Sequence, residues 1–194
     1  MHSKELWEEE YNKYDIPPWN SDEFDLDYKD YFKNKRDLSV IDLGCGNGSQ
    51  VYYLEQLGFD VTGTDIVNAL EYDIKKFIID DSLNSKLTEK YDVVLDKGLI
   101  HNLIYDQRRS NYFEMVDNIT HDTSVIVLKV LSKDEMRFNP NVSSPNPYRF
   151  TKDQLVNLYS PLGFECFSFK DTYFYSHLKP YLKGYMTIYK KLLM

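Results

Sequence analysis

A glycine-rich loop between two patterned segments constrains the fold of this chain more than any other stretch. Residues 38–41 have the character of a buried strand, and three glycines follow at alternate positions between 44 and 48. Beyond them, Val51, Leu54 and Leu57 recur at helical spacing. Glycines allow a ligand to approach the backbone closely, and the start of a helix offers free N–H groups. Strand, glycine loop and helix therefore predict a ligand site.

A second signal lies at the end of the next expected strand, at 59–65. This strand ends in Asp65, whose carboxylate can accept hydrogen bonds from both ribose hydroxyls of an adenosine. The loop does not have the dinucleotide-binding form G-x-G-x-x-G, because Ser49 occupies the position of the last glycine. A nucleoside-containing ligand other than a dinucleotide is therefore favoured over a purely structural turn.

The sequence D-x-G-C-G-x-G, which begins at Asp42, resembles motif I of class I S-adenosylmethionine (SAM) methyltransferases. The resemblance implies that the chain binds SAM and releases S-adenosylhomocysteine. It also implies an α/β fold with a Rossmann-like, seven-stranded, mostly parallel sheet that is flanked by helices and has its last strand antiparallel. The cofactor contacts implied in this region are Asp42, Gly44, Cys45, Gly46, Asn47, Gly48, Asp65 and Ile66.

Further elements follow from periodicity and segment length. Strands are expected at 75–79, 93–95, 123–130, 163–170 and 184–191, which with the two above make seven. Helices are expected at 67–72, where only a short one fits, and at 106–120 and 150–159. Residues 131–149 have no period and predict a long loop, which in a compact domain is usually functional or mobile.

Two later stretches carry further candidate residues. By the resemblance, an acidic residue followed by a small one after the 75–79 strand contacts the adenine amino group. Asp81-Ser82 fits this pattern best and Asp80 is the close alternative, while a solvated turn would also explain the three residues.

The other stretch follows the expected strand at 93–95, at the edge where open α/β sheets bind ligands. Asp96-Lys97-Gly98-x-x-His101 resembles a motif of small-molecule methyltransferases, which implies that Asp96, Lys97 and Gly98 contact the cofactor. His101 and Asp96 are candidate catalytic residues, with His101 as a general base. A packed histidine without a chemical role is the competing interpretation.

The N-terminal segment predicts a cover for the site. Ser3 can cap a helix over 3–14, which Pro17-Pro18 ends, and an aromatic, acidic covering helix is expected within 21–35. The arrangement of Tyr11, Tyr14 and Trp19 resembles the N-terminal lid of methyltransferases of the thiopurine and tellurite-resistance type. The resemblance implies that Tyr11 and Trp19 contact the cofactor and that Tyr14 lies close to the reaction.

Length, net charge and cysteine content limit the domain organisation and the molecules that this chain can be expected to bind. The 194 residues predict a single domain. By the resemblance it is a methyltransferase domain, with a lid in 1–35 and a core in 36–194. The net charge of −8 and the pI of about 5.0 argue against nucleic acid and anionic membranes. Cys45 and Cys166 are expected to be reduced thiols of a cytoplasmic protein. No spacing of a zinc site and no recognisable acidic set occurs, so no metal is expected.

These features predict an enzyme that methylates a small molecule, with a thiol or a metalloid favoured as the acceptor. Two alternatives stay open. The stretch Leu95-Asp96-Lys97-Gly98-Leu99 also resembles one in elongation-factor lysine methyltransferases, although Asn102 departs from that family. A module that binds SAM without transferring its methyl group would retain the same glycine loop.

Overall fold

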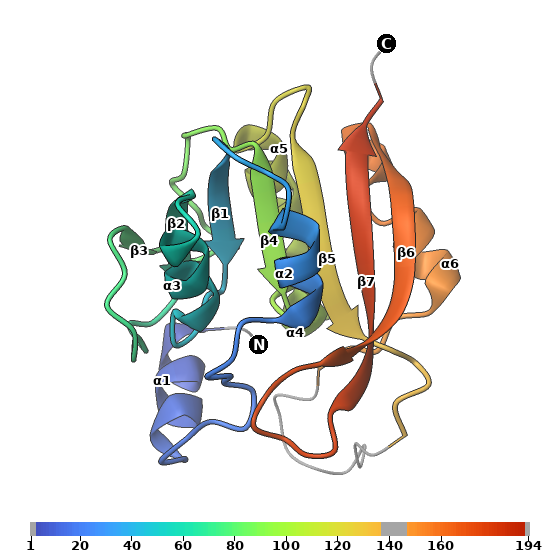
Figure 1. The fold of residues 1–194 in the computed structure, drawn as a ribbon. Coiled ribbons are helices and arrows are strands. Elements are labelled where there is room, and N and C mark those ends of the chain that lie inside the picture. The colour runs from blue at the N-terminus through green and yellow to red at the C-terminus, as the bar shows by residue number, and fades with distance from the viewer. Residues whose placement is uncertain (1–2, 137–146, 193–194) are drawn as a thin grey trace.

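A seven-stranded sheet forms the centre of the computed structural model, which describes residues 3–136 and 147–192 (Figure 1). The strand order is β3-β2-β1-β4-β5-β7-β6. Only β7 is antiparallel to its neighbours, β5 and β6, and the other pairs are parallel. This confirms the sheet expected from the sequence. The strands are β1 Ser39–Leu43, β2 Asp60–Asp65, β3 Phe77–Ile79, β4 Val93–Lys97, β5 Val125–Leu131, β6 Phe164–Phe174 and β7 Leu182–Lys191.

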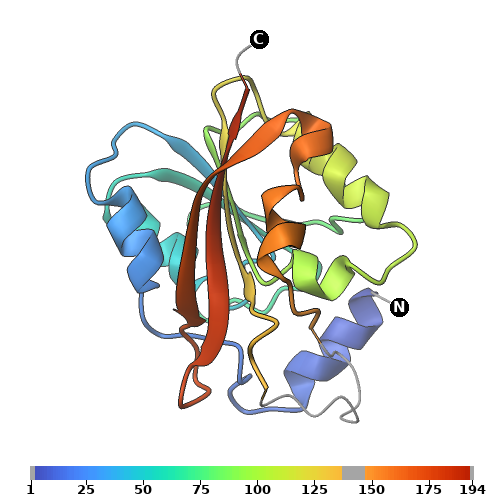
Figure 2. The same ribbon diagram turned by 90° about the vertical axis from the view of Figure 1, so that its right-hand side faces the viewer.

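Helices cover both faces of the sheet (Figure 2). They are α1 Lys4–Asn12, α2 Leu26–Phe32, α3 Ser49–Gln56, α4 Ile100–Leu103, α5 Arg109–Asn118, α6 Lys152–Val156 and the 3₁₀ helix η1 Ser160–Leu162. Because side chains alternate along a strand, successive strand residues enter different cores. Val93 packs with α2 and α3 on one face, while Val94 packs with α5 and α6 on the other. The parallel strands are therefore apolar on both faces.

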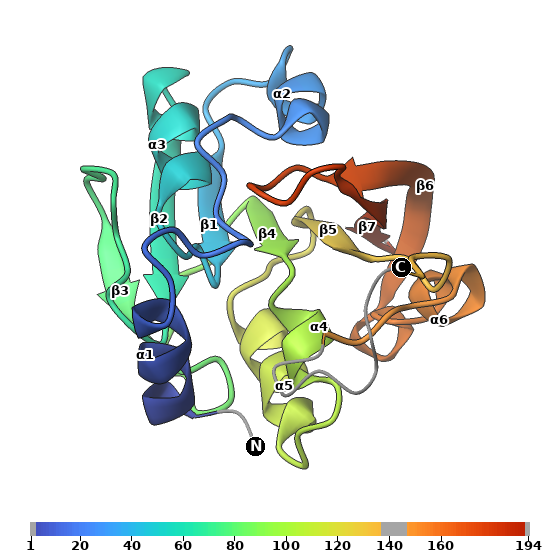
Figure 3. The same ribbon diagram turned by 90° about the horizontal axis from the view of Figure 1, so that it is seen from below.

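The N-terminal helix α1 lies at the edge of the sheet where the parallel strands end (Figures 1 and 3). Ser3 caps it, since the Ser3 hydroxyl accepts a hydrogen bond from the Leu6 N–H at 3.3 Å. A second cap begins α2, where the Asp25 carboxylate accepts from the Asp27 N–H. Both expected N-terminal helices are thus present, and the second is limited to two turns.

The structure differs from the sequence-based expectation in the segment after β2. The short helix expected at 67–72 is absent. The Asn47 carbonyl accepts hydrogen bonds from the Glu71 and Tyr72 N–H groups at 3.0 and 3.3 Å. These N–H groups are satisfied by the glycine loop, so the segment does not need helical hydrogen bonds. Of the long loop expected at 131–149, residues 137–146 lie outside the described part of the chain.

Candidate active site

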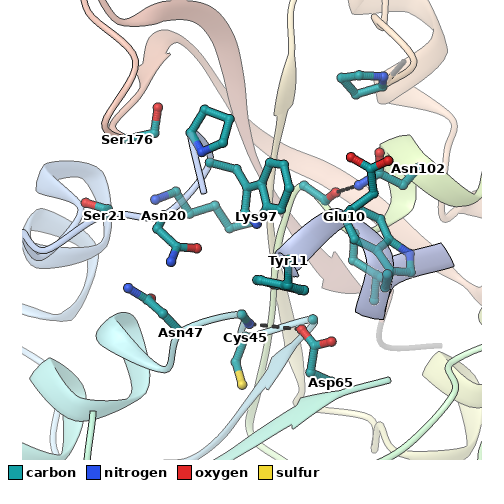
Figure 4. A pocket seen from close by; sticks show the side chains of 18 of the residues that line it. Glu10, Tyr11, Asn20, Ser21, Cys45, Asn47, Asp65, Lys97, Asn102 and Ser176 are labelled. Atoms are coloured by element: carbon teal, nitrogen blue, oxygen red, sulfur yellow. Dashed lines mark hydrogen bonds between the residues drawn. The ribbon is translucent and has the colours of Figure 1, made fainter. Parts of the chain in front are cut away.

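A cavity of about 500 Å³ lies at the carboxyl ends of β1, β2 and β4. The glycine loop, the N-terminal segment and the connection from β6 to β7 complete its wall (Figure 4). The candidate residues from the sequence that line it are Tyr11, Tyr14, Trp19, Asp42, Gly44, Cys45, Gly46, Asn47, Asp65, Ile66, Asp80, Ser82, Lys97, Gly98 and His101. Three candidates, Gly48, Asp81 and Asp96, do not line it.

The glycine loop is shaped by backbone that only glycine adopts easily. Gly44 and Gly46 have φ angles of 67° and 56°. A Cβ on Gly46 would lie 3.2 Å from the Tyr11 hydroxyl, so the aromatic cover approaches the loop closely. The Gly46 N–H donates to the Asp65 carboxylate at 3.0 Å. The end of β2 therefore holds the loop open toward the cavity.

Two buried carboxylates, Asp42 and Asp65, face this loop. They are 2% and 8% exposed. Burial raises the pKa of Asp42 to about 7, although the nearby Lys97 opposes the shift. Burial also raises the pKa of Asp65, against hydrogen bonds from the Gly46 and Val67 N–H groups. Carboxylates that are this poorly solvated are suited to bind a cation or a pair of hydroxyls.

Asp96 lies beneath the cavity wall and fixes the turn after β4. Its carboxylate accepts hydrogen bonds from the Leu99 N–H at 2.7 Å and from the Tyr112 hydroxyl at 2.7 Å. It is fully buried, and burial raises its pKa to about 6. Tyr112 in turn shares a hydrogen bond with Tyr159. The arrangement orients the start of α4, and with it His101, without exposing Asp96 to a ligand.

His101 is a neutral, packed ring at the cavity wall. Its imidazole stacks on Phe174 with ring centroids 5.6 Å apart. It is 6% exposed, and burial lowers its pKa to about 3. Its Nδ1 has no hydrogen-bond partner among the described residues. A ring with so low a pKa is a weak base near neutral pH, but it can accept or donate one hydrogen bond.

Lys97 connects the cavity to a buried network of charges. Its Nζ donates to the Tyr175 carbonyl at 2.9 Å and lies 3.5 Å from Asp25. Behind it, Lys129 on β5 bonds Asp25 and Asp27, each at 2.6 Å. Sequence reasoning did not single out Lys129 or its partners. A lysine inside the apolar run of β5 was the available signal, because a buried lysine needs a paired charge.

The aromatic side chains of the N-terminal segment pack around Trp19. Trp7, Tyr11 and Tyr14 each meet its ring edge-on, with centroids 5.9, 5.5 and 5.8 Å away. Such contacts stabilise by about 0.5–1.5 kcal/mol each beyond the area they bury. The four rings thus form one unit, and the Tyr11 hydroxyl of this unit lies close to Gly46 of the glycine loop.

Asn20 fastens this unit to the rest of the site. Its amide donates to Glu71 at 2.9 Å, and Asn47 of the glycine loop donates to the other oxygen of the same carboxylate. The Asn20 carbonyl accepts from the His177 N–H at 2.9 Å. Three segments far apart in the sequence are therefore joined at one buried asparagine. Sequence reasoning missed Asn20, and only its place directly after Trp19 could have suggested it.

Glu10 is a further lining residue that sequence reasoning did not propose. It is 3% exposed and comes from α1, where Trp7 lies three positions before it, and Tyr14 follows two residues after the helix ends. One carboxylate oxygen bonds Lys13. Its position on the aromatic face of the helix was the signal available in the sequence.

The described residues, 3–136 and 147–192, show neither a metal-binding group nor a membrane-spanning helix. Within these ranges, no three side chains of His, Cys, Asp or Glu form a group suited to a metal ion. No helix in the same ranges is both long and apolar enough to cross a membrane.

Comparison with known proteins places this chain in a family. Residues 8–160 match the model of the tellurite resistance protein TehB. The chain belongs to the TehB family. No curated protein sequence matches it.

Solved structures show the same fold at low sequence identity. A structure reported for the conversion of a disulfide bond into a thioacetal group during echinomycin biosynthesis has a TM-score of 0.78, with 17% identity over 98% of this chain and 92% of that one. A TehB-like SAM-dependent methyltransferase from Corynebacterium glutamicum has a TM-score of 0.64, with 14% identity over 97% and 98%.

A third structure is an N-methyltransferase with a ligand in place. The 1,6-didemethyltoxoflavin-N1-methyltransferase from Burkholderia thailandensis, with its acceptor and S-adenosylhomocysteine bound, has a TM-score of 0.64, with 16% identity over 85% and 75%. The family and the fold together confirm the resemblance to SAM-dependent methyltransferases near the tellurite-resistance type.

Proposed function

We propose that the chain transfers the methyl group of SAM to a small-molecule acceptor and releases S-adenosylhomocysteine. The observation that carries the proposal is one cavity that joins the glycine loop, the buried Asp42 and Asp65, and an aromatic cover. The residues fit this cofactor. A Cβ on Gly44 would lie 3.2 Å from the Leu99 side chain, so glycine there lets the loop pack closely against the turn after β4.

Each part of the cofactor has a candidate partner. Asp65 would accept hydrogen bonds from the ribose hydroxyls, and Asp42 would meet the ammonium group of the methionine part. Asp80 and Ser82 are suited to the adenine, since both line the cavity beyond Asp65. When bound, SAM supplies a methyl group on a sulfonium, which is a good leaving group. What remains for the protein is to position the acceptor and to exclude water.

The cover favours a small acceptor. Residues of α1 and the segment after it line the cavity, so a protein substrate would have to reach past them. The elongation-factor type of lysine methyltransferase is therefore the weaker alternative. Among the structural neighbours, one was reported for the conversion of a disulfide bond into a thioacetal group, and another is an N1-methyltransferase. The thiol or metalloid expected from the sequence stays a prediction.

The function is tested by SAM labelled in its methyl group. Label is expected to enter small molecules of a metabolite extract and not protein, and calorimetry is expected to detect binding of S-adenosylhomocysteine. Binding without transfer to any fraction would instead favour the non-catalytic module. Label that enters only protein would favour the lysine methyltransferase.

Replacing Asp65 with alanine is expected to weaken binding of S-adenosylhomocysteine by about 1–3 kcal/mol, because the ribose hydroxyls lose their acceptor. Asp65→Asn retains one carbonyl oxygen for the Gly46 N–H and should lose less. Asp60→Asn, at the other end of β2 and 64% exposed, is the matched control. Calorimetry that finds equal affinity for the Asp65→Ala and Asp60→Asn variants would remove Asp65 from the site.

Ligands are expected to protect the N-terminal segment from protease, because closure over the site excludes water. Lys13 is 52% exposed and offers trypsin a site within the cover. Cleavage there should slow when S-adenosylhomocysteine and an acceptor are bound. Cleavage after Lys152, which is 53% exposed on α6, is the internal reference. A constant ratio of the two rates would mean that the segment is a fixed packing element.

A further inference from the structure

The described wall of the cavity carries more acidic than basic side chains. They are Glu10, Asp42, Asp65, Asp80, Lys13 and Lys97. Each lysine is already within ion-pair distance of a carboxylate, that of Glu10 or Asp25. The other three acids form no ion pair within the described chain. A cation in the cavity would stabilise their anionic forms, because burial leaves these groups poorly solvated. The wall therefore favours a positively charged ligand over a neutral one.

The positive sulfur of SAM would lie over the glycine loop. In SAM this sulfur is bonded to the ribose on one side and to the amino-acid chain on the other, whose proposed partners are Asp65 and Asp42. The loop crosses from the end of β1 to the end of β2, since the Cys45 N–H donates to the Thr64 carbonyl and the Gly46 N–H to the Asp65 carboxylate. The sulfur that joins the two parts of SAM thus belongs over this crossing.

Tyr11 is the aromatic residue that meets the same part of the loop. A Cβ on Gly46 would lie 3.2 Å from its hydroxyl. Packing holds its ring in place, with the ring centroids of Trp19 and Trp7 at 5.5 and 6.3 Å. Burial, and to a smaller extent the Asp65 carboxylate, raises the pKa of Tyr11, so the phenol stays neutral. A neutral aromatic ring attracts a cation through the negative face of its π system.

We propose that Tyr11 recognises the positive charge of the sulfonium, and that the site therefore holds SAM more tightly than S-adenosylhomocysteine. The inference rests on the proposed methyl transfer. When the methyl group leaves, the electron pair of its bond stays on sulfur, which becomes a neutral thioether. The attraction of Tyr11 and of the unpaired carboxylates for this sulfur is then lost. Transfer itself would thus promote the exchange of the product for a new molecule of SAM.

Calorimetry with three ligands tests the proposal. They are SAM, S-adenosylhomocysteine and sinefungin, in which a carbon that bears a protonated amine replaces the sulfonium. The protein is expected to bind SAM and sinefungin about threefold to thirtyfold more tightly than S-adenosylhomocysteine, the range for a cation–π contact. Tyr11→Leu should weaken binding of the two cationic ligands by about this factor and change the third by less than about twofold. Tyr11→Phe, which retains the ring, should keep most of the preference.

Tyr173→Leu is the matched control, because Tyr173 is 51% exposed on β6 and does not line the cavity. It should bind all three ligands as the parent does. Equal or tighter binding of S-adenosylhomocysteine by the parent would overturn the proposal, and this comparison needs no variant to fold. An equal loss for all three ligands in Tyr11→Leu would also overturn it. Binding without a preference would refute this inference alone, whereas no binding of any ligand would refute the proposed function as well.

Discussion

Replacing Lys129 with methionine is expected to lower the free energy of unfolding by about 3–5 kcal/mol, the cost of removing one partner from a buried ion pair. Lys129 is fully buried, and its Nζ lies 2.6 Å from both Asp25 and Asp27. Methionine fills a similar volume, so the loss would come from the carboxylates and not from a void. Urea unfolding, followed by circular dichroism, measures the change.

Lys170 provides the matched comparison within the same network. It bonds Asp27 at 2.6 Å, but its side chain is 55% exposed. Solvent screens such a pair, so Lys170→Met should cost less than about 1 kcal/mol. Adding Asp25→Asn and Asp27→Asn to Lys129→Met should recover part of the loss, because no unpaired charge then remains buried. Equal stability of Lys129→Met and Lys170→Met would mean that the network does not hold the fold together.

The affinity for S-adenosylhomocysteine is expected to fall by roughly tenfold for each pH unit below 7, if Asp42 binds the ammonium group as a carboxylate. Burial raises the pKa of Asp42 to about 7, so the free protein takes up a proton there that the ligand must displace. Calorimetry between pH 5 and 8 measures the slope. Asp42→Asn should flatten it, and any slope that remains belongs to Asp65, whose pKa burial also raises.

The stability of the free protein should respond to Asp42 with the opposite sign. The folded pKa lies above that of an unfolded aspartate, so the folded state binds more protons between about 4 and 7. The contribution of Asp42 is therefore present at low pH and is lost as the pH rises through this window. Asp42→Asn should stabilise the free protein more at pH 7.5 than at pH 5. Equal effects at both values would contradict the raised pKa.

The sheet and the glycine loop that follows β1 could be predicted from the sequence because their signals are local. Gly44 and Gly46 have positive φ angles, which glycine adopts most easily, Asp65 ends β2 as expected, and apolar runs mark the buried strands. The short helix expected at 67–72 does not form. There the Asn47 carbonyl, some twenty residues away, satisfies the backbone in place of helical hydrogen bonds.

The residues that sequence reasoning missed depend on partners far along the chain. Lys129 meets Asp25 and Asp27 across about a hundred residues, and Asn20 meets Glu71 across about fifty. No pattern in a window of ten or twenty residues contains both members of such a pair. His101 illustrates a different limit, because its neutral state follows from packing against Phe174 rather than from its position after Gly98.

The hydrogen bonds of Asn20 attach the N-terminal segment to the rest of the site at a single residue. The sequence before Asn20 can therefore vary separately from the sequence after it. Glu10, Tyr14 and Trp19 precede this point, whereas Asp42, Asp65 and the glycine loop follow it on the sheet. A graft that exchanges only the first nineteen residues would therefore leave intact Asp42 and Asp65, the proposed partners of the ammonium group and the ribose. Acceptor preference could then change, in evolution or by engineering, through replacement of the first nineteen residues alone. The proposed cofactor-binding residues on the sheet would stay the same.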